Sequence, residues 1–185
     1  MNVVLYNTFL SVPFLMGFSR VPDIILPTWV FWVFPIFWPF IIPIVIVLYS
    51  IVMWLFMLYL KIDKTLKTIK KTIIKVSFFG FLCDLIVVGF LSLITFGGRV
   101  INHTSDLYYW YKDVFLKYLQ INPFDNIFVL LTICSAILLS RVINYKLNKR
   151  YSFSKFDTDE ETKKKLALYM TIFTAPYIFF FSVTI

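Results

Sequence analysis

The sequence has few of the charged residues that a soluble domain displays on its surface. Of its 185 residues only 15% are charged and 60% are hydrophobic, whereas about a quarter of a soluble domain is charged. A chain this small has too little interior to bury such an apolar surplus. Disorder is excluded by the same composition, and 5 Gly and 8 Pro without a period exclude a collagen-like chain. The composition therefore predicts an all-α polytopic membrane protein.

Groups that carry catalysis or bind metals are also scarce. The chain holds 1 His and 2 Cys, and both Cys83 and Cys134 fall inside apolar runs, where we expect small buried side chains. No catalytic Ser/His/Asp or Cys/His set can be assembled around His103. One histidine with two intramembrane thiols makes no metal cluster. We therefore expect no enzyme, no cofactor and no metal site.

Four transmembrane helices are predicted, because a bilayer crossing needs about 20 helical residues. The segment 24–60 has no charged residue, but prolines interrupt its first half, so the first span begins only in its second half. Pro176 bends the last span, where the Thr174 hydroxyl could satisfy a freed carbonyl. The four spans are placed at about 41–60, 76–96, 127–145 and 166–185.

Residues 1–185 are expected to form one integral membrane domain. Its N-terminal part is rich in Trp and Pro and should be external or interfacial, because Trp favours the membrane–water boundary. Within this part, 24–40 is interfacial, re-entrant or a fifth span. The segments outside the spans are 1–40 (external, Trp- and Pro-rich), 61–75 (cytoplasmic, basic, amphipathic), 97–125 (external, aromatic-rich) and 146–165 (cytoplasmic, basic).

The net charge of +8 is distributed unevenly along the chain. Of the 18 basic residues, 14 lie in 61–75 and 141–165. Because Lys- and Arg-rich loops stay in the cytoplasm, both segments should face the cytoplasm, with both termini and 97–125 outside. We predict a multi-pass protein of the cytoplasmic membrane, and the excess of Lys over Arg is typical of an AT-rich bacterial gene. Nothing resembles a basic nucleic-acid-binding module, so no nucleic acid is expected as a partner.

Asp84 is the one acidic residue inside a predicted span. It lies about 12 Å from the cytoplasmic end at the helical rise. A lone carboxylate at that depth is costly unless it is protonated, paired or wetted, so it should face the protein interior. Arg141, near the cytoplasmic end of the third span, could reach the same depth. Asp84 and Arg141 are therefore the candidate intramembrane polar site, either as a structural pair or as a proton or cation site.

Three further sets of residues are candidates for contacts with helices, lipid or partners. Small residues at four-residue spacing lie on one face of the third and of the fourth span, which we expect to pack together. Lysines line one face of 61–75, which is typical of a helix on an anionic leaflet. Aromatic residues cluster in the outer loop, which is typical of an interfacial belt or of a docking surface. The sets are Thr132, Ala136, Ser140, Ala167, Thr171 and Ala175; Lys61, Lys64, Lys67, Lys71 and Lys75; and Tyr108, Tyr109, Trp110, Tyr111 and Phe115.

Helix-start signals precede three of the predicted helices. Thr158 and Glu161 have the spacing of a capping box, which predicts that the last helix begins in water near residue 159. Thr104 or Ser105 could cap a short helix in the outer loop, and residues 125–126 could cap the third span.

The first hypothesis for function is a non-enzymatic small integral membrane subunit of a larger cytoplasmic-membrane assembly, such as a secretion or conjugation machine. It rests on the lack of catalytic groups, the aromatic outer segments and the small-residue faces. The alternatives are an immunity protein against a membrane-active toxin and a small transporter or channel that uses Asp84. The expected partners are the lipid bilayer, with anionic lipids at its cytoplasmic face, and other membrane proteins.

Overall fold

The computed structural model describes residues 25–62, 66–98, 105–154, 156 and 158–184. These residues are mostly helical, and three helices are long and apolar enough to cross a membrane. The prediction of a mostly helical chain with apolar helices long enough to cross a membrane is confirmed, whereas four such helices are not. The three helices cover Pro35–Tyr59, Ile69–Gly97 and Ile127–Ser152.

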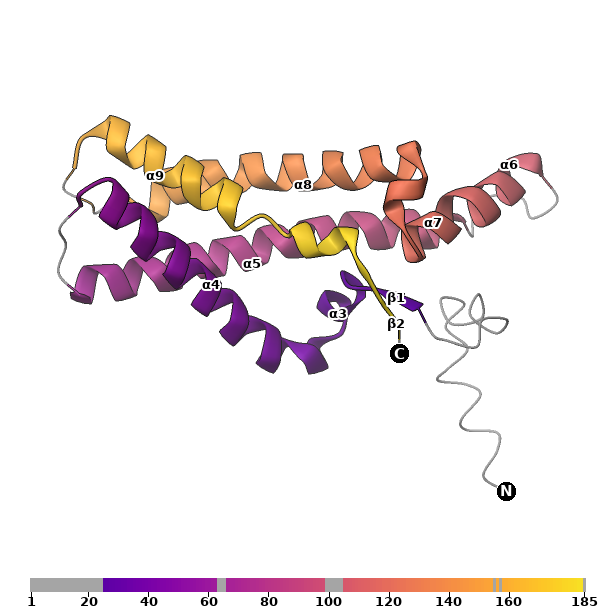
Figure 1. Cartoon of the computed structure of the whole chain (residues 1–185), viewed down its shortest axis with the longest axis horizontal. Helices are drawn as coiled ribbons and strands as arrows, with labels where there is room; N and C mark the ends of the chain where they lie inside the picture. The colour runs from indigo at the N-terminus through magenta and orange to yellow at the C-terminus, as the bar shows by residue number, and fades with distance from the viewer. Residues whose placement is uncertain (1–24, 63–65, 99–104, 155, 157, 185) are drawn as a thin grey trace, which may run out of the picture.

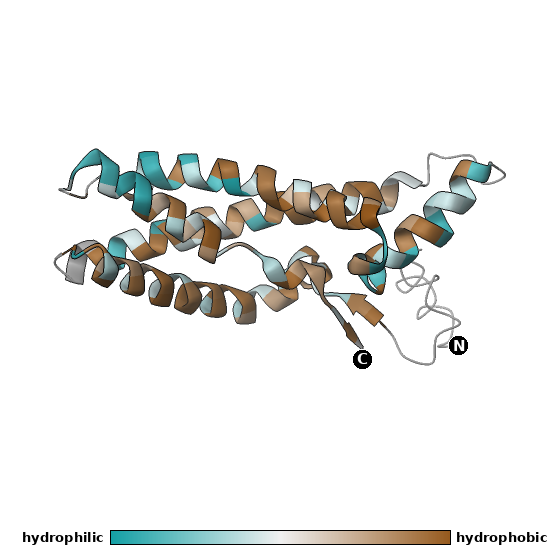
Figure 2. Ribbon diagram, turned by 45° about the horizontal axis from the view of Figure 1, so that its top comes forward, coloured by the Kyte–Doolittle hydropathy of each residue, from teal (hydrophilic) through white to brown (hydrophobic). Residues whose placement is uncertain are grey.

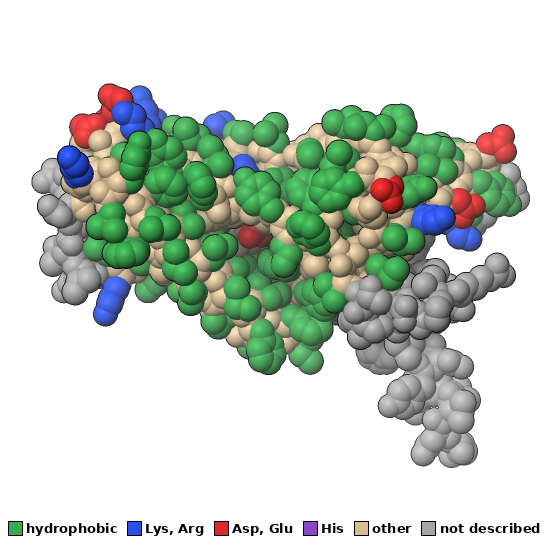
Figure 3. Space-filling view, in the orientation of Figure 1, with side chains coloured by type: hydrophobic (Ala, Val, Ile, Leu, Met, Phe, Trp, Pro, Cys, Tyr) green, Lys and Arg blue, Asp and Glu red, His purple; other side chains and the backbone are tan. Residues whose placement is uncertain are grey.

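An elongated helix bundle makes up most of the molecule. Helices α4 (Trp38–Tyr59), α5 (Leu66–Gly97) and α8 (Ile127–Leu147) are its longest elements. α5 and α8 run side by side, and α4 crosses α5 obliquely (Figure 1). The shorter α9 (Glu160–Phe173) packs against α4 and α8. Polar residues gather at the two ends of the bundle, while hydrophobic side chains cover its middle (Figure 2, Figure 3).

The two ends of the bundle have different structures. At one end, here called the basic end, α4 ends, α5 and α9 begin, and the π-helix η5 (Asn148–Ser152) continues α8. At the opposite end, here called the aromatic end, a helical arm projects beyond the bundle and leads into the 3-10 helix η4 (Pro123–Asp125). The arm consists of α6 (Asp106–Tyr109), the π-helix η3 (Trp110–Leu116) and α7 (Lys117–Gln120).

The basic segment predicted at 61–75 is not a separate surface helix. From Leu66 onward it is the first part of α5, which continues without interruption into the spanning region. The sequence explains this continuity, because no Pro or Gly occurs between Leu66 and Gly80 to end the helix. The lysines from Lys67 onward therefore lie on a helix that is long and apolar enough to cross a membrane, before its apolar part begins.

The described part of the N-terminal segment is folded against the bundle. It contains β1 (Ile25–Pro27), the short helix α3 (Val30–Val33) and the 3-10 helix η1 (Pro35–Phe37). α3 contacts α5, and Val30 is buried. Residues 1–24 of the predicted external segment lie outside the described residues.

The prediction of a continuous fourth helix over 166–185 is wrong. α9 ends at Phe173, and the chain continues after a break as the 3-10 helix η6 (Tyr177–Phe180) and the strand β2 (Ser182–Thr184). β2 pairs antiparallel with β1. Pro176 accounts for the break, because proline has no N–H for the helical ladder and its ring clashes with the preceding turn. The segment still runs from the basic end toward the aromatic end (Figure 1).

Side-chain caps begin three of the helices. Asn126 and Ser105 cap α8 and α6, each accepting backbone N–H groups of the first turn. The prediction of Thr158 as the cap of α9 is wrong, because Asp159 takes that position and accepts the Thr162 N–H at 2.8 Å. Aspartate also places a negative charge at the positive end of the helix dipole.

Two apolar cores lie along the bundle. The aromatic-end core joins α3, α5, α8, the arm and η6, and the basic-end core joins α4, α5, α9 and the segment after η5. The aromatic-end core contains Trp29, Val30, Val87, Val88, Leu91, Phe115, Leu119, Val129, Ile133, Ala136, Ile137 and Phe179. The basic-end core contains Val45, Tyr49, Val52, Met53, Met57, Ile62, Val76, Phe153, Phe156, Leu166, Ala167 and Met170.

Candidate functional site

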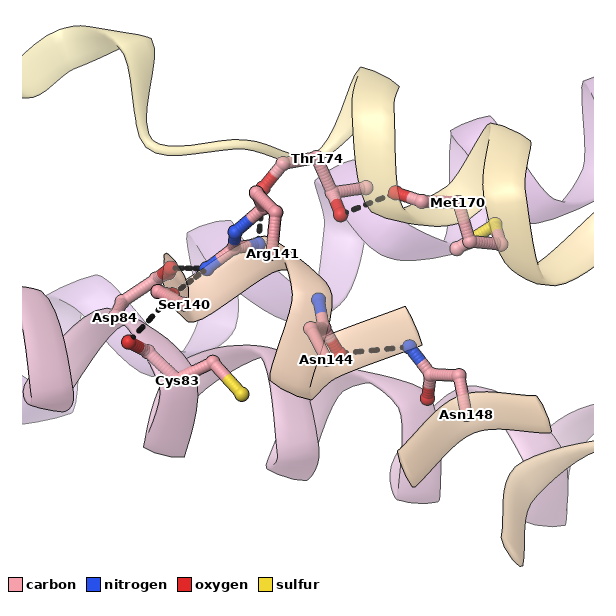
Figure 4. A network of polar contacts seen from close by, with 8 residues as sticks. All are labelled: Cys83, Asp84, Ser140, Arg141, Asn144, Asn148, Met170 and Thr174. Carbon is pink, nitrogen blue, oxygen red and sulfur yellow. Dashed lines mark hydrogen bonds and ion pairs between the residues drawn. The ribbon is translucent and has the colours of Figure 1, made fainter. Parts of the chain in front are cut away.

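A layer of buried polar side chains separates the two cores. It consists of Asp84 on α5, Ser140 and Arg141 on α8, and Thr174 directly after α9 (Figure 4). Asp84 is 4% exposed and Arg141 is 7% exposed. Along α5, α8 and the C-terminal segment, apolar residues on one side of the layer pack in the aromatic-end core, and those on the other side pack in or against the basic-end core. The layer therefore crosses the interior of the bundle.

Arg141 connects the three segments that meet in this layer. Its Nη2 forms the ion pair with Asp84 Oδ1 and donates to Ser140 Oγ at 3.0 Å. Its Nη1 donates to the backbone oxygen of Thr174 at 3.3 Å. Ser140 Oγ donates in turn to the backbone oxygen of Cys83 at 2.8 Å. One guanidinium group thereby links α5, α8 and the broken C-terminal segment (Figure 4).

The two charges of the pair neutralise each other inside the bundle. Burial of an unpaired ion in an apolar interior costs several kcal/mol, and a partner with additional hydrogen bonds offsets that cost. The carboxylate of Asp84 has its counter-ion at contact distance, and the guanidinium has three acceptors. This arrangement favours a structural role, because it leaves no net charge in the layer to attract an ion.

Side chains also supply hydrogen-bond donors to the backbone around the break after α9. The Tyr177 hydroxyl donates to the backbone oxygen of Ile172 at 2.9 Å. On the other side, Thr28 Oγ1 donates to the backbone oxygens of Ile178 and of Phe181, the latter at 2.9 Å. Irregular backbone at membrane depth is tolerated where protein satisfies its polar groups. The break is therefore held by specific contacts and is not a frayed helix end.

A second row of buried polar side chains continues from Arg141 toward the basic end. Asn144, Asn148 and Ser152 follow at four-residue spacing on α8 and η5, and all three are buried. Asn148 Nδ2 donates to Asn144 Oδ1 at 2.8 Å, and Ser152 Oγ donates to Asn148 Oδ1 at 2.8 Å. This asparagine row fixes the inner face of η5.

Several buried polar atoms near both rows have no hydrogen-bond partner among the described residues. These atoms belong to α5, α8 and α9, toward the basic end: Ser77 Oγ, Arg141 Nε, Asn144 Nδ2 and Thr171 Oγ1. The Tyr49 hydroxyl, which is 1% exposed, lies close to the Asp84–Arg141 pair and interacts with it.

The structure brings the candidate residues Asp84 and Arg141 together and packs α8 against α9. The small residues of the two faces have different neighbours, although Ala136 and Ala175 share the aromatic-end core. Ser140 faces α5 through its bond to Cys83, and Ala136 lies in the aromatic-end core. Ala167 lies in the basic-end core with α4. The remaining members are Thr171, which is buried, and Thr132 and Ala175, which are partly exposed.

The lysine and aromatic sets are only partly exposed at the ends of the bundle. Lys61, Lys71 and Lys75 are exposed, whereas Lys64 and the side chain of Lys67 lie outside the described residues. Tyr109 and Trp110 are 55% and 42% exposed, and Tyr108 is half-buried.

Two aromatic residues of the arm point into the protein. The prediction of an exposed Phe115 is wrong, because this ring is buried in the aromatic-end core. The hydroxyl of the half-buried Tyr111 donates to the backbone oxygen of Ile94, and burial raises the pKa of Tyr111 above its usual value. Both residues anchor the arm to the bundle. The prediction that Cys134 is buried is also wrong, because this residue is exposed on α8.

No sequence pattern indicated the two residues that hold the break. Thr28 bonds to backbone 150 and 153 positions away, and no local pattern encodes such a contact. Tyr177 acts within one turn of the proline, where an aromatic hydroxyl carries no recognised signal. The prediction that the Thr174 hydroxyl satisfies a carbonyl freed by Pro176 is wrong. That hydroxyl donates to the backbone oxygen of Met170, which already accepts the Thr174 N–H, whereas the freed oxygen of Ile172 accepts from Tyr177.

The described residues contain no group of three or more His, Cys, Asp or Glu side chains that could hold a metal ion. Comparisons of the chain with protein-family models, with curated proteins and with solved structures found no match.

Proposed function

We propose that the chain is a non-enzymatic integral membrane subunit that acts by binding other membrane proteins in a larger assembly. The proposal rests on one observation: Asp84 and Arg141 of the polar layer make their contacts within the protein. Asp84 and Arg141 neutralise each other and hold three segments together. The exposed aromatic residues of the arm are among the groups left available to other molecules.

The aromatic arm supports a binding role because it combines anchored and exposed aromatic side chains. Phe115 and Leu119 fix it in the aromatic-end core. Leu107, Tyr109 and Trp110 are exposed on the same arm, which projects beyond the bundle (Figure 1). Exposed Trp and Tyr on a rigid support are typical of the residues that dominate protein–protein contacts. The arm is therefore the proposed docking surface.

The proposed orientation places the basic end in the cytoplasm and the aromatic end outside. It is supported by the concentration of basic residues at one end of the bundle and by the retention of Lys- and Arg-rich segments in the cytoplasm. In this orientation the arm presents its aromatic residues at the outer surface of the cytoplasmic membrane.

Co-purification in a mild detergent tests the binding role. The tagged chain should recover a membrane protein in fixed stoichiometry, and the Tyr109→Ala/Trp110→Ala variant should lose it. The matched control is Trp54→Ala. It removes an aromatic side chain that is 62% exposed but lies on α4 instead of on the arm. A monomer without any partner, or equal loss in the control, would contradict the proposal.

Transport through the polar layer is the second candidate, and one observation favours it. A discontinuous span meets a charged pair inside the bundle, which is an arrangement that transporters use at their binding sites. The unpartnered polar atoms toward the basic end would supply part of a path. In proteoliposomes, flux of a cation or of protons that depends on the chain and disappears in Asp84→Asn would establish this role. Equal flux in both would exclude it.

A further inference from the structure

A hollow of about 730 Å³ opens at the basic end beside α8, η5 and the start of α9. Four basic side chains line it, together with one carboxylate and the ring of Tyr145. The basic residues are Lys146, Lys149, Arg150 and Lys163, and the carboxylate is Glu160. The residues of the polar layer do not line this hollow.

The hollow retains a positive charge after its internal ion pair is counted. Glu160 Oε1 lies 3.0 Å from Lys163 Nζ, and this hydrogen bond with the charge of Lys163, Lys149 and Lys164 lowers the pKa of Glu160. Glu160 therefore remains ionised and cancels one cation. Three basic groups of the hollow remain without a carboxylate partner among the described residues. Such a surplus attracts an anion.

The helix that carries three of these cations is fixed from its inner side. The asparagine row holds η5 through buried bonds of Asn144, Asn148 and Ser152. Lys149 and Arg150 lie within this π-turn, next to Asn148 in the chain. π-turns often occur at functional sites, because they change the direction of side chains relative to a regular helix. The cations are therefore held on a rigid support.

An exposed apolar stripe leads from the middle of α8 directly to the hollow. Leu138 and Val142 are 70% and 47% exposed. Lys146 and Arg150 follow them at four-residue spacing, and both are exposed as well. Residues four apart lie on one helix face, so one stripe presents an apolar part followed by a cationic part. This is the order of an acyl chain followed by a phosphate headgroup.

We infer that this hollow binds the phosphate headgroup of an anionic phospholipid, with an acyl chain along Leu138 and Val142. The recognised chemistry is a phosphodiester anion attached to an apolar chain. Basic pockets between membrane helices at the cytoplasmic side suit such headgroups. The site is separate from the proposed docking surface, so neither proposal depends on the other.

The test measures lipid binding to the purified full chain in detergent micelles by native mass spectrometry. Phosphatidylglycerol should bind in a one-to-one complex, and phosphatidylcholine should not. The variant Lys146→Gln/Arg150→Gln should bind phosphatidylglycerol about 25-fold more weakly, since each basic residue contributes about five-fold near an anionic headgroup. The control Lys112→Gln/Lys117→Gln removes the same charge from exposed positions on the arm, at the opposite end of the bundle from the hollow, and its affinity should change less than two-fold.

Three outcomes would overturn the inference. Equal losses in both double variants would show a diffuse basic surface, and equal binding of the two lipids would show no headgroup selectivity. Displacement of the lipid by an equal concentration of glycerol phosphate would assign the hollow to a soluble phosphate compound instead. An unfolding temperature of both variants equal to that of the unmodified chain verifies that the folds are intact.

Discussion

Gly80 on α5 provides the space into which Tyr49 of α4 packs. A Cβ atom on Gly80 would lie 1.9 Å from Tyr49 Oη and 2.3 Å from its Cζ, which is far inside contact distance. Tyr49 is 1% exposed and belongs to the basic-end core, so its ring has no open space to move into. The lack of a side chain on Gly80 therefore allows α4 and α5 to pack closely together.

The variant Gly80→Ala should lower the free energy of unfolding by about 1–3 kcal/mol, because overpacking forces the ring and the backbone to shift. Chemical unfolding in detergent measures the effect. Gly89→Ala is the matched control on the same helix, since a Cβ there meets nothing within 4 Å. It should leave stability unchanged or raise it by up to about 1 kcal/mol. Equal destabilisation in both variants would contradict the packing argument.

Asp159 gives the start of α9 a dependence on pH. Hydrogen bonds from Thr162 to the carboxylate lower the pKa of Asp159 below its usual 3.8. A group with a lowered pKa in the folded state stabilises that state at pH values above the unfolded pKa. The stabilisation is lost as the pH falls through the folded pKa. The first turn of α9 should therefore loosen below about pH 3.8.

The Thr162 amide resonance measures this change. It should lose its hydrogen-bonded position at low pH in the unmodified chain, and Asp159→Asn should remove the dependence, since asparagine caps without titrating. The Tyr108 amide is an internal control, because its cap is the hydroxyl of Ser105. A pH response of Thr162 that persists in Asp159→Asn would assign the effect to another group.

Charged residues of the interior could be predicted from the sequence, but the threonine that holds the C-terminal segment could not. Asp84 and Arg141 stand out because they are rare charges beside long apolar runs, and the cost of burying them demands a partner. Thr28 is an ordinary residue in a Trp- and Pro-rich stretch. Thr28 can hold the C-terminal segment only after β1 and β2 have paired, so no local sequence pattern predicts this contact.

At the scale of elements, the broken C-terminal segment differs most from its sequence pattern. An apolar run of 20 residues at 166–185 predicts a helix by length and hydropathy alone. Pro176 indicated a bend, but the strand that follows depends on a partner at the other end of the chain. Long-range strand pairing leaves no trace in the periodicity of the segment itself. The end of α9 at Phe173 therefore could not be predicted from the length and hydropathy of this segment.

The variant Thr28→Val should loosen this segment, because it removes the donor to the backbone oxygens of Ile178 and Phe181. The single hydroxyl proton of Thr28 is shared between these two acceptors, so its loss removes about 1 kcal/mol and corresponds to about a 5-fold loss of protection. Hydrogen exchange of the amides in 177–184 measures it. Thr132→Val is the control, since that hydroxyl donates only within its own helix. Unchanged exchange in Thr28→Val would show that strand pairing alone holds the segment.

At the scale of the whole molecule, the distribution of basic residues predicts how the bundle sits in the membrane. Two variants with both native cysteines replaced each carry one new cysteine. Lys71→Cys marks the basic end, and Leu107→Cys marks the arm. A membrane-impermeant thiol reagent should label Leu107→Cys in intact cells. Lys71→Cys should react only after permeabilisation. Labelling in the opposite order would reverse the orientation and place the proposed docking surface in the cytoplasm.

The polar layer holds the whole molecule together, because it joins two spanning helices and the C-terminal segment between the two cores. Loss of one charge leaves the other buried without a partner, which costs about 3–5 kcal/mol, whereas replacement of both by neutral groups costs much less. The two single variants Asp84→Asn and Arg141→Gln and their combination therefore distinguish a structural pair from two independent polar residues.

Unfolding of these four proteins in detergent, as a double-mutant cycle, tests the structural role of the pair most directly. Each single variant should lose about 3–5 kcal/mol, and the double variant should regain most of this loss. Single variants as stable as the unmodified chain, or a double variant whose loss equals the sum of the two single losses, would contradict it.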